Sequence, residues 1–155
     1  MIAIETMRVD EAEEVSRLLV ASIRHGLNGY YAPQVIEALA LANDTVAVLK
    51  HAPKQTDYVA RLDGRMIGMI GLKRNEIGHL YVLPEEQGRG AGRALVDFAR
   101  RTFLAAGHRE MFVLAALNAV GFYGRCGFVE HSRGSFNLAN GLPLEFVKMT
   151  CPTLS

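Results

Sequence analysis

The feature of this sequence that most limits its possible folds is a glycine-rich turn near the middle of the chain. Residues 87–93 read Gln-Gly-Arg-Gly-Ala-Gly-Arg, and they lie between a run typical of a strand and a run typical of a helix. Glycines lack Cβ atoms, so several backbone N–H groups can converge on one anion there, and the helix start adds unpaired donors and a positive dipole end. The turn therefore predicts an α/β protein with a binding site for a phosphate or a pyrophosphate.

Two common phosphate-binding motifs do not fit this turn. The dinucleotide-binding fingerprint requires a third glycine three residues after the second. Gly88 and Gly90 are followed at that distance by Arg93, and Gly90 and Gly92 are followed by Leu95. A P-loop requires Lys and then Ser or Thr directly after its last glycine, which this turn lacks. A tight turn with a purely structural role is the other interpretation of the same residues.

The composition favours a single domain. The chain has 155 residues, a formal net charge of +1 and 50% hydrophobic residues. A chain of this length can bury a substantial core without disulfides or metals, so we expect one domain over residues 1–155. A net charge near zero argues against a nucleic-acid partner held by the overall field. A narrower cluster, Arg89, Arg93, Arg100 and Arg101, lacks interleaved aromatic residues, so it does not change that expectation.

Several other classes of site find no support in the sequence. No apolar run reaches the roughly 18 residues of a membrane span, and residues 1–10 do not resemble a secretory signal, so we expect no membrane partner. The two cysteines, Cys126 and Cys151, form no framework, and reduced thiols in a cytoplasmic protein are the simplest interpretation. The five histidines lack metal-binding spacing, so no metal site is expected.

Strand-like and helical patterns alternate along the chain. Asp10, followed by Glu13, predicts a capping box at the first helix, Asp63-Gly64 predicts a hairpin turn, and Gly107 predicts a helix end. The predicted strands cover residues 2–8, 57–62, 66–73, 76–83, 110–115, 128–132 and 144–149, and the predicted helices cover 10–25, a stretch from 33, 90–106 and 119–126. This order predicts a single α/β (α+β) domain with a mixed, largely antiparallel sheet.

Two motifs in this framework resemble the GNAT superfamily of N-acetyltransferases. Gln87-x-x-Gly90-x-Gly92 is similar to the family's Q/R-x-x-G-x-G/A motif, and the preceding residues 80–84 resemble its fourth strand. Residues 118–128, which carry an Asn, a Phe-Tyr pair and a Gly-Phe pair, resemble a second family block that follows one helix and one strand later. The resemblance is strong over about residues 57–132, and the first 56 residues match only in the order of elements.

The resemblance implies a fold and an activity. The expected fold has six to seven strands and about four helices, with a splayed parallel pair of strands that holds the cofactor. The expected reaction transfers an acetyl group from acetyl-coenzyme A to a primary amine of a small molecule or peptide, by direct attack in a ternary complex and without a metal. A homodimer is expected because family members are often dimers. The alternative is a regulatory module that binds coenzyme A without turnover.

The resemblance also assigns a cofactor site. The backbone of residues 87–93 would bind the pyrophosphate, and the exposed edge of residues 80–82 would pair with the pantetheine arm. A backbone N–H near Val82 would polarise the thioester carbonyl. Asn118 would bind pantetheine or order a water, although it is also a good helix N-cap. The expected cofactor-binding residues are Leu80, Tyr81, Val82, Gln87, Gly88, Arg89, Gly90, Ala91, Gly92, Arg93, Asn118 and Tyr123.

The catalytic assignments are Tyr123 and Glu76. Tyr123 matches the tyrosine that protonates the departing sulfur, and its alternative is a packed aromatic residue next to Phe122. Glu76 matches a fourth-strand glutamate that accepts the proton, and its alternative is a solvated carboxylate at a strand end. His79 is a second candidate base, but three residues of strand place it opposite Glu76 unless a bulge intervenes. Cys126 would permit an acyl-cysteine route, although a small buried residue fits better there.

The acceptor side is less constrained. Tyr30, Tyr31 and the residues around 24–29 match the family's acceptor wall, with packing between helices as the alternative. Residues 131–142 would form another wall or a hairpin loop. Charge is segregated, because residues 1–86 hold nine basic and twelve acidic side chains whereas residues 87–133 hold seven arginines and three acids. The basic part is expected to face the anionic cofactor, and the acidic part is expected to face a cationic amine.

Overall fold

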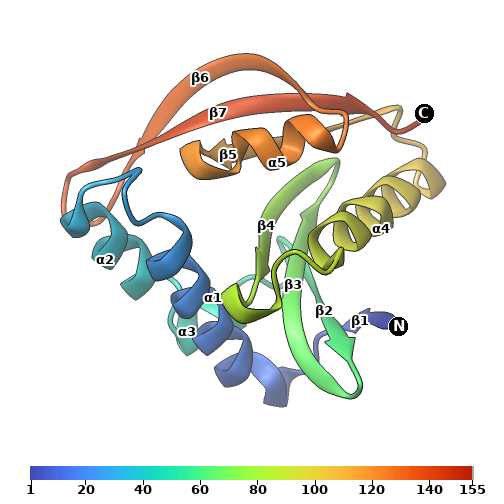
Figure 1. Cartoon of the computed structure of the whole chain (residues 1–155), viewed down its shortest axis with the longest axis horizontal. Coiled ribbons are helices and arrows are strands. Elements are labelled where there is room, and N and C mark those ends of the chain that lie inside the picture. Colours follow the sequence, from blue (N-terminus) through green and yellow to red (C-terminus); the bar gives the residue numbers. More distant parts are fainter. Residues whose placement is uncertain (155) are drawn as a thin grey trace.

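The computed structural model describes residues 1–154, so only Ser155 of the expected domain lies outside it. Within these residues the chain forms one seven-stranded sheet in the order β1-β2-β3-β4-β5-β7-β6 (Figure 1). The strands are β1 Ile2–Thr6, β2 Thr56–Leu62, β3 Arg65–Lys73, β4 Glu76–Val82, β5 Glu110–Ala116, β6 Val129–Asn137 and β7 Pro143–Pro152. The α-helices are α1 Ala12–Gly26, α2 Pro33–Leu41, α3 Thr45–Leu49, α4 Ala91–Ala105 and α5 Val120–Arg125. Short 3-10 turns are η1 Val9–Glu11, η2 Pro84–Glu86 and η3 Leu117–Ala119.

The sheet is divided by a splay between β4 and β5. These two strands are parallel and pair only at Glu76 with Phe112 and at Ile77 with Val113. Beyond Ile77, β4 pairs with β3 alone, and β5 pairs with β7 along its whole length. The expected parallel pair is therefore present, and its strands diverge like the arms of a V (Figure 1).

A β-bulge accompanies the divergence. The register between β3 and β4 shifts so that Gly71 lies opposite His79 while Leu72 lies opposite Ile77, which leaves Gly78 as the extra residue. A bulge bends its strand and increases the local twist. The bulge thus lies at the point where β4 begins to turn away from β5.

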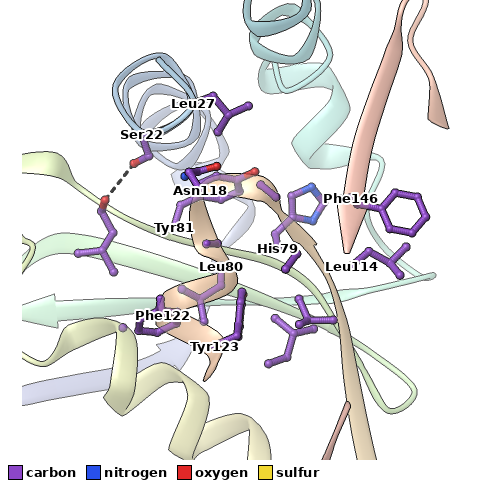
Figure 2. A pocket seen from close by; sticks show the side chains of 18 of the residues that line it. Ser22, Leu27, His79, Leu80, Tyr81, Leu114, Asn118, Phe122, Tyr123 and Phe146 are labelled. Atoms are coloured by element: carbon purple, nitrogen blue, oxygen red, sulfur yellow. Dashed lines mark hydrogen bonds between the residues drawn. The ribbon is translucent and has the colours of Figure 1, made fainter. Parts of the chain in front are cut away.

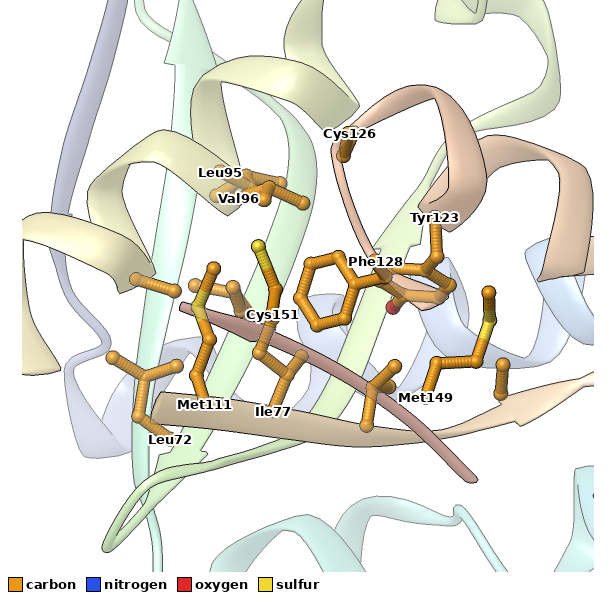
Figure 3. Packing of buried hydrophobic residues seen from close by; sticks show 14 of the residues in the cluster. Leu72, Ile77, Leu95, Val96, Met111, Tyr123, Cys126, Phe128, Met149 and Cys151 are labelled. Carbon is orange, nitrogen blue, oxygen red and sulfur yellow. The ribbon is translucent and has the colours of Figure 1, made fainter. Parts of the chain in front are cut away.

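Helices cover both faces of the first half-sheet, β1 to β4. The apolar side of α1 packs over β2 and β3 together with α2 and α3, and Val15, Leu19 and Ile23 are fully buried in that core. On the other face, Leu95 and Ala99 of α4 are fully buried in a second core, which continues to β5, β7 and α5 (Figure 3). The spacing of these residues matches the helical period, so apolar burial fixes both helices against the sheet.

The first helix begins differently from the prediction. Asp10 does not cap it, because its carboxylate pairs with Arg8 at the surface. Instead the backbone N–H of Arg8 donates to Oε1 of Glu11 at 2.9 Å, and Glu11 is buried against Arg61. The prediction of Asp10 as N-cap is therefore wrong, since a 3-10 turn precedes α1 and moves the helix start to Ala12.

Of the other element boundaries predicted from sequence, some are confirmed and some differ in the structure. Asp63 and Gly64 both have positive φ angles, of 52° and 81°, as the predicted hairpin requires, and Gly107 follows α4 at φ 92°. Helix α3 was not expected; Asp44 begins it by accepting the Ala47 N–H at 2.8 Å. β6 and β7 are both longer than predicted, so much of the segment 131–142 is strand rather than loop. None of the helices in residues 1–154 combines the length and apolarity needed to cross a membrane.

Candidate functional site

A cavity of about 1040 Å³ occupies the opening between β4 and β5. Binding sites for one drug-sized molecule usually have volumes of about 300–1,000 Å³, so this cavity lies at the upper end of that range. Of the residues assigned from sequence, it is lined by Glu76, Leu80, Tyr81, Val82, Gln87, Gly88, Gly90, Ala91, Gly92, Arg93, Asn118 and Tyr123. The splay therefore brings both motif regions to one cavity. Arg89 is not part of that lining.

The glycine-rich turn is open toward the cavity. Gly88 and Gly90 have φ angles of 82° and 85°, which L side chains rarely adopt, and no atom lies within 4 Å of where their Cβ atoms would be. Gly90 directly precedes α4, so the helix starts with its unpaired N–H groups at this opening. Gly92 has another role, because its Cβ would lie 3.0 Å from the Phe122 ring. Gly92 allows α4 to approach α5 closely.

The two arginines of the turn are held by protein groups. Arg89 lies 3.7 Å from Glu86, and an Arg93 N–H donates to the Arg125 carbonyl at 3.0 Å. Arg93, in the first turn of α4, and Arg125, at the end of α5, both line the cavity. Together with the helix dipole they make this end of the cavity suited to an anion.

The free edge of β4 is fixed by two side chains. The Val82 carbonyl accepts hydrogen bonds from Ser22 at 3.2 Å, drawn in Figure 2, and from Gln87 at 3.3 Å. The Leu83 N–H bonds to β3, and strand backbone groups alternate in direction, so the Val82 N–H faces the opening instead. Gln87 thus ties the turn to β4. Ser22 was missed by sequence reasoning because only the packing of α1 brings it to Val82.

Tyr123 is a packed aromatic residue that also lines the cavity. Its side chain is only 4% exposed and packs edge-on against Phe122 and Phe128, with ring centroids 5.1 and 5.3 Å away (Figure 3). It also lines the cavity (Figure 2). Burial, followed by its neighbour Tyr81, raises the pKa of Tyr123 well above the usual value of a phenol. The hydroxyl therefore stays protonated near neutral pH.

Asn118 does not cap a helix, so that interpretation is wrong. The residue lies inside η3, Ala119 stands at the start of α5, and no side chain caps either element. Asn118 Oδ1 is buried and has no hydrogen-bond partner among the described residues. An unsatisfied buried acceptor costs about 1–3 kcal/mol. Because the side chain lines the cavity, a ligand N–H can satisfy it there.

Glu76 and His79 both line the cavity. The bulge at Gly78 intervenes between them, which is the condition under which the two side chains share a face of β4. The Glu76 side chain is 16% exposed, and its Oε1 lies 3.5 Å from Lys73 Nζ. Glu76 is therefore a partly buried carboxylate with one cationic neighbour, rather than a freely solvated one.

His79 belongs to a polar cluster that the sequence did not reveal. Its ring stacks on His51 at 4.7 Å, and its Nδ1 lies 3.0 Å from Gln55 Nε2. The same amide nitrogen is 2.7 Å from Oδ1 of Asp57, whose Oδ2 lies 2.6 Å from Nδ1 of His51. A carboxylate can only accept, so the Gln55 nitrogen donates to Asp57 and its second N–H points to His79.

The cluster sets the state of the His79 ring. Burial, and then the neighbouring His51, lowers the pKa of His79 to about 4, so the imidazole is neutral near pH 7. The Gln55 amide lies against Nδ1 of this ring, with its Nε2 at 3.0 Å and its Oε1 at 3.4 Å. A signal for the cluster exists at Gly71 and Gly78, because a Cβ at either position would overlap the Gln55 side chain. Sequence alone does not show which side chain fills that space.

Cys126 is buried at the end of α5 and is not part of the cavity lining. Burial raises the pKa of its thiol, which makes the thiolate less available. Both observations favour the small buried residue expected from sequence over an acyl-cysteine intermediate.

The acceptor wall expected from sequence also reaches the cavity. Tyr31 donates its hydroxyl proton to the Glu145 carbonyl at 2.6 Å and accepts the Leu117 N–H at 2.8 Å. These bonds connect the loop between α1 and α2 to β7 and to the end of β5. From the segment 131–142, Phe136 and Leu138 line the cavity. Tyr31 is thus a bridge between the two half-sheets and not only a packing residue.

Comparisons with known proteins agree with this geometry. A family model described as an acetyltransferase (GNAT) domain matches residues 30–152. Over 105 residues the chain is 32% identical to an uncharacterized N-acetyltransferase of Chlorobaculum tepidum. That alignment covers 64% of this chain and 65% of the relative, so the chain spans slightly less than two thirds of the relative's length.

Solved structures share the whole fold. A GCN5-related N-acetyltransferase of Rhodopseudomonas palustris superimposes with a TM-score of 0.91 at 29% identity, covering 97% of this chain and 94% of the other. The PaiA N-acetyltransferase of Thermoplasma acidophilum, solved in complex with coenzyme A, superimposes with a TM-score of 0.78 at 20% identity, covering 98% and 99%. The splayed sheet and the glycine-rich turn therefore belong to a known architecture.

Proposed function

The chain belongs to the GNAT acetyltransferase family, and from this premise we propose that it transfers an acetyl group from acetyl-coenzyme A to a primary amine by direct attack in a ternary complex. The amine belongs to a small molecule or a peptide. One observation carries the proposal. A single cavity runs from the open glycines at the start of α4, past the unpaired edge of β4, to the buried hydroxyl of Tyr123.

The residues of the cavity fit acetyl-coenzyme A. The N–H groups at Gly88 and Gly90, with Arg93, suit its phosphates because the backbone there is open and the helix dipole is positive. The orphaned Oδ1 of Asn118 suits an amide N–H of the pantetheine arm. The outward N–H of Val82 suits the thioester carbonyl. When bound, acetyl-coenzyme A supplies an activated acyl group, and no metal takes part in the proposal.

Two side chains act as proton acceptor and proton donor in the proposed reaction. Glu76 accepts the proton of the attacking ammonium, directly or through a water, because its carboxylate reaches the cavity from β4. Tyr123 donates its phenolic proton to the departing sulfur; its raised pKa means that the proton is present on the hydroxyl before the thiolate leaves. His79 fits the role of base less well, since its ring is stacked on His51 and its Nδ1 is already engaged with Gln55.

The replacement Tyr123→Phe tests the proposal. It removes the proton donor but keeps the ring that packs between Phe122 and Phe128. We expect kcat to fall about 10²- to 10⁴-fold, the usual contribution of a general acid, while the Kd for acetyl-coenzyme A changes little. Thiol release measures the rate, and calorimetry measures binding. An unchanged rate removes the donor role, and coenzyme A binding without thiol release from any amine indicates the regulatory module instead.

A cytoplasmic homodimer completes the proposal. Both cysteines are free thiols, as a reducing compartment requires. β6 is the outermost strand and is exposed along its full length, so its free edge is available for pairing with a second copy. Sedimentation velocity at micromolar concentration measures the assembly state, and a monomer under those conditions contradicts the dimer.

A further inference from the structure

The part of the cavity away from the glycine-rich turn has an apolar wall. This wall is made by the second half-sheet, which consists of β5, β7 and β6. Leu144 and Phe146 on β7 lie on one strand face, and their partners across the hairpin are Phe136 and Gly134. The rings of Phe136 and Phe146 have centroids 4.7 Å apart. A Cβ on Gly134 would lie 2.7 Å from the Phe146 ring, so the glycine makes room for that ring. Leu114 of β5 extends the same wall.

The facing wall combines apolar and polar residues. Its apolar part is formed by Leu27 and Leu39 from the helices, by Tyr31, and by Tyr81 and the ring of His79 on β4, and the lining also includes His25, Asn43, Gln55 and Lys73. In Figure 2, Phe146 and Leu114 lie on the side of the second half-sheet, and His79 and Tyr81 project from β4 toward the same space. Burial raises the pKa of Tyr81 to about 12, so its hydroxyl is uncharged.

Few negative charges reach this cavity. Of the twelve acidic residues in 1–86, only Glu76 and Glu86 line it, so the sequence expectation that this acidic part faces the amine is wrong for the others. Glu86 is engaged by Arg65 at 2.6 Å, and Glu76 is paired with Lys73. Glu145 adds one carboxylate on an exposed residue at the rim. Among the lining residues, a polycationic acceptor would find the exposed Glu145 and the partly buried Glu76, which already lies next to Lys73.

We propose that the amine acceptor carries an aromatic or branched aliphatic group, which binds between the Phe136–Phe146 wall and the His79–Tyr81 wall while its amine lies near Glu76. The inference rests on the proposed function, because it names the substrate class of that same cavity. Apolar contact with these rings removes the hydrophobic group from water and supplies the binding free energy.

An acceptor series tests the inference on the full chain with acetyl-coenzyme A. Phenethylamine and isoamylamine are compared with ethylamine and with the polycations spermidine and kanamycin, by thiol release. We expect kcat/KM for phenethylamine to exceed that for ethylamine by about 10- to 100-fold, in line with the value of a filled apolar pocket. Equal values for the two amines, or a preference for either polycation, overturn the inference.

Variants locate the binding site. Phe136→Ala removes a ring that is 47% exposed, so the fold tolerates it better than Phe146→Ala. Either change is expected to lower the ratio of kcat/KM for phenethylamine to that for ethylamine about tenfold. Val129→Ala is the matched control on the same strand, because Val129 is 64% exposed and lies outside the cavity lining. An unchanged ratio in both phenylalanine variants overturns the location.

Direct binding separates this inference from the proposed function. If no amine releases thiol, phenethylamine binding to the coenzyme A-loaded protein is measured by NMR, through shifts of the Phe136 and Phe146 ring protons. Binding with those shifts supports the aromatic site although acetyl transfer fails. Absence of binding, while ethylamine or spermidine is acetylated, overturns the aromatic site and leaves the transferase proposal intact.

Discussion

The two half-sheets on either side of the cavity are built by different means. In the first half-sheet, β3 is buried at seven consecutive positions, Met66–Leu72, because α1 to α3 cover one face and α4 covers the other. In the second half-sheet, β6 is exposed at all nine of its positions and forms the free edge. The first half-sheet is a layer packed on both faces that carries Glu76 and leads into the turn, whereas the second is a thinner wall of the cavity with an exposed edge. The two halves thus differ in how deeply their strands are buried.

The largest difference between the halves is expected in stability. Ile70→Ala removes a fully buried side chain from the centre of β3 and leaves a cavity. We expect the free energy of unfolding to fall by about 2–5 kcal/mol. Val129→Ala on β6 is expected to change it by less than about 0.5 kcal/mol. Urea unfolding followed by circular dichroism measures both, and similar values for the two variants would remove the contrast between the halves.

The His79 cluster gives the first half-sheet a pH dependence. The unfolded chain protonates His79 near its ordinary pKa of about 6.5, whereas the folded protein does so only near about 4. The neutral imidazole thus contributes stability above about pH 6.5, and this contribution is lost as the pH falls toward 4, by up to about 3 kcal/mol. Unfolding at pH 7.5 and pH 4.5 measures the loss, and His79→Gln is expected to reduce it. An equal loss in the variant assigns the pH dependence to other groups.

Two glycines close to the cavity are expected to respond in opposite directions. Gly90→Ala places a side chain at φ 85° and is expected to destabilise the fold by about 1–2 kcal/mol. Gly124 lies within α5, and no atom lies near the position of an added Cβ, so Gly124→Ala is expected to stabilise the fold by about 0.5–1 kcal/mol.

The larger replacement Gly90→Val is expected to abolish acetyl-coenzyme A binding. Normal binding in a folded Gly90→Val protein excludes the turn as the phosphate site.

The smallest effect is expected at an ion pair between helices of the first half. Arg24 and Glu37 connect α1 to α2 at 2.8 Å, but both side chains are 54% exposed. Water and salt screen such a pair, so Glu37→Ala is expected to leave the free energy of unfolding almost unchanged. Thermal unfolding at low and high salt measures it. A larger cost that persists in high salt would show that the helix pair depends on this contact.

Sequence patterns predicted the parts of the fold that are determined by nearby residues. The glycine-rich turn, the hairpin at Asp63-Gly64 and the helices with an apolar stripe all follow from backbone conformation or periodic burial. The length of β6 was missed because a fully exposed edge strand carries no alternating pattern. The start of α1 was misplaced because Glu11, buried against Arg61, replaces the expected cap.

Sequence motifs predicted the parts of the candidate site whose residues lie within one short segment. The turn and the Asn118–Phe128 block each place their side chains locally, and the cavity lining includes both. The contacts of Ser22 with Val82, and of Gln55 with His79, join residues that are far apart in the chain. Such pairs depend on how helices and loops pack against β4. Only the assembled fold shows them.

The bridge made by Tyr31 has a consequence for the shape of the cavity. The half-sheets pair at Ile77 with Val113, and the Tyr31 hydroxyl connects the loop between α1 and α2 to Leu117 and Glu145. The walls of the cavity are therefore connected at two separate places. Because both hydrogen bonds at the second place belong to one phenol, removing that hydroxyl frees the loop from β7 and from the end of β5 at once.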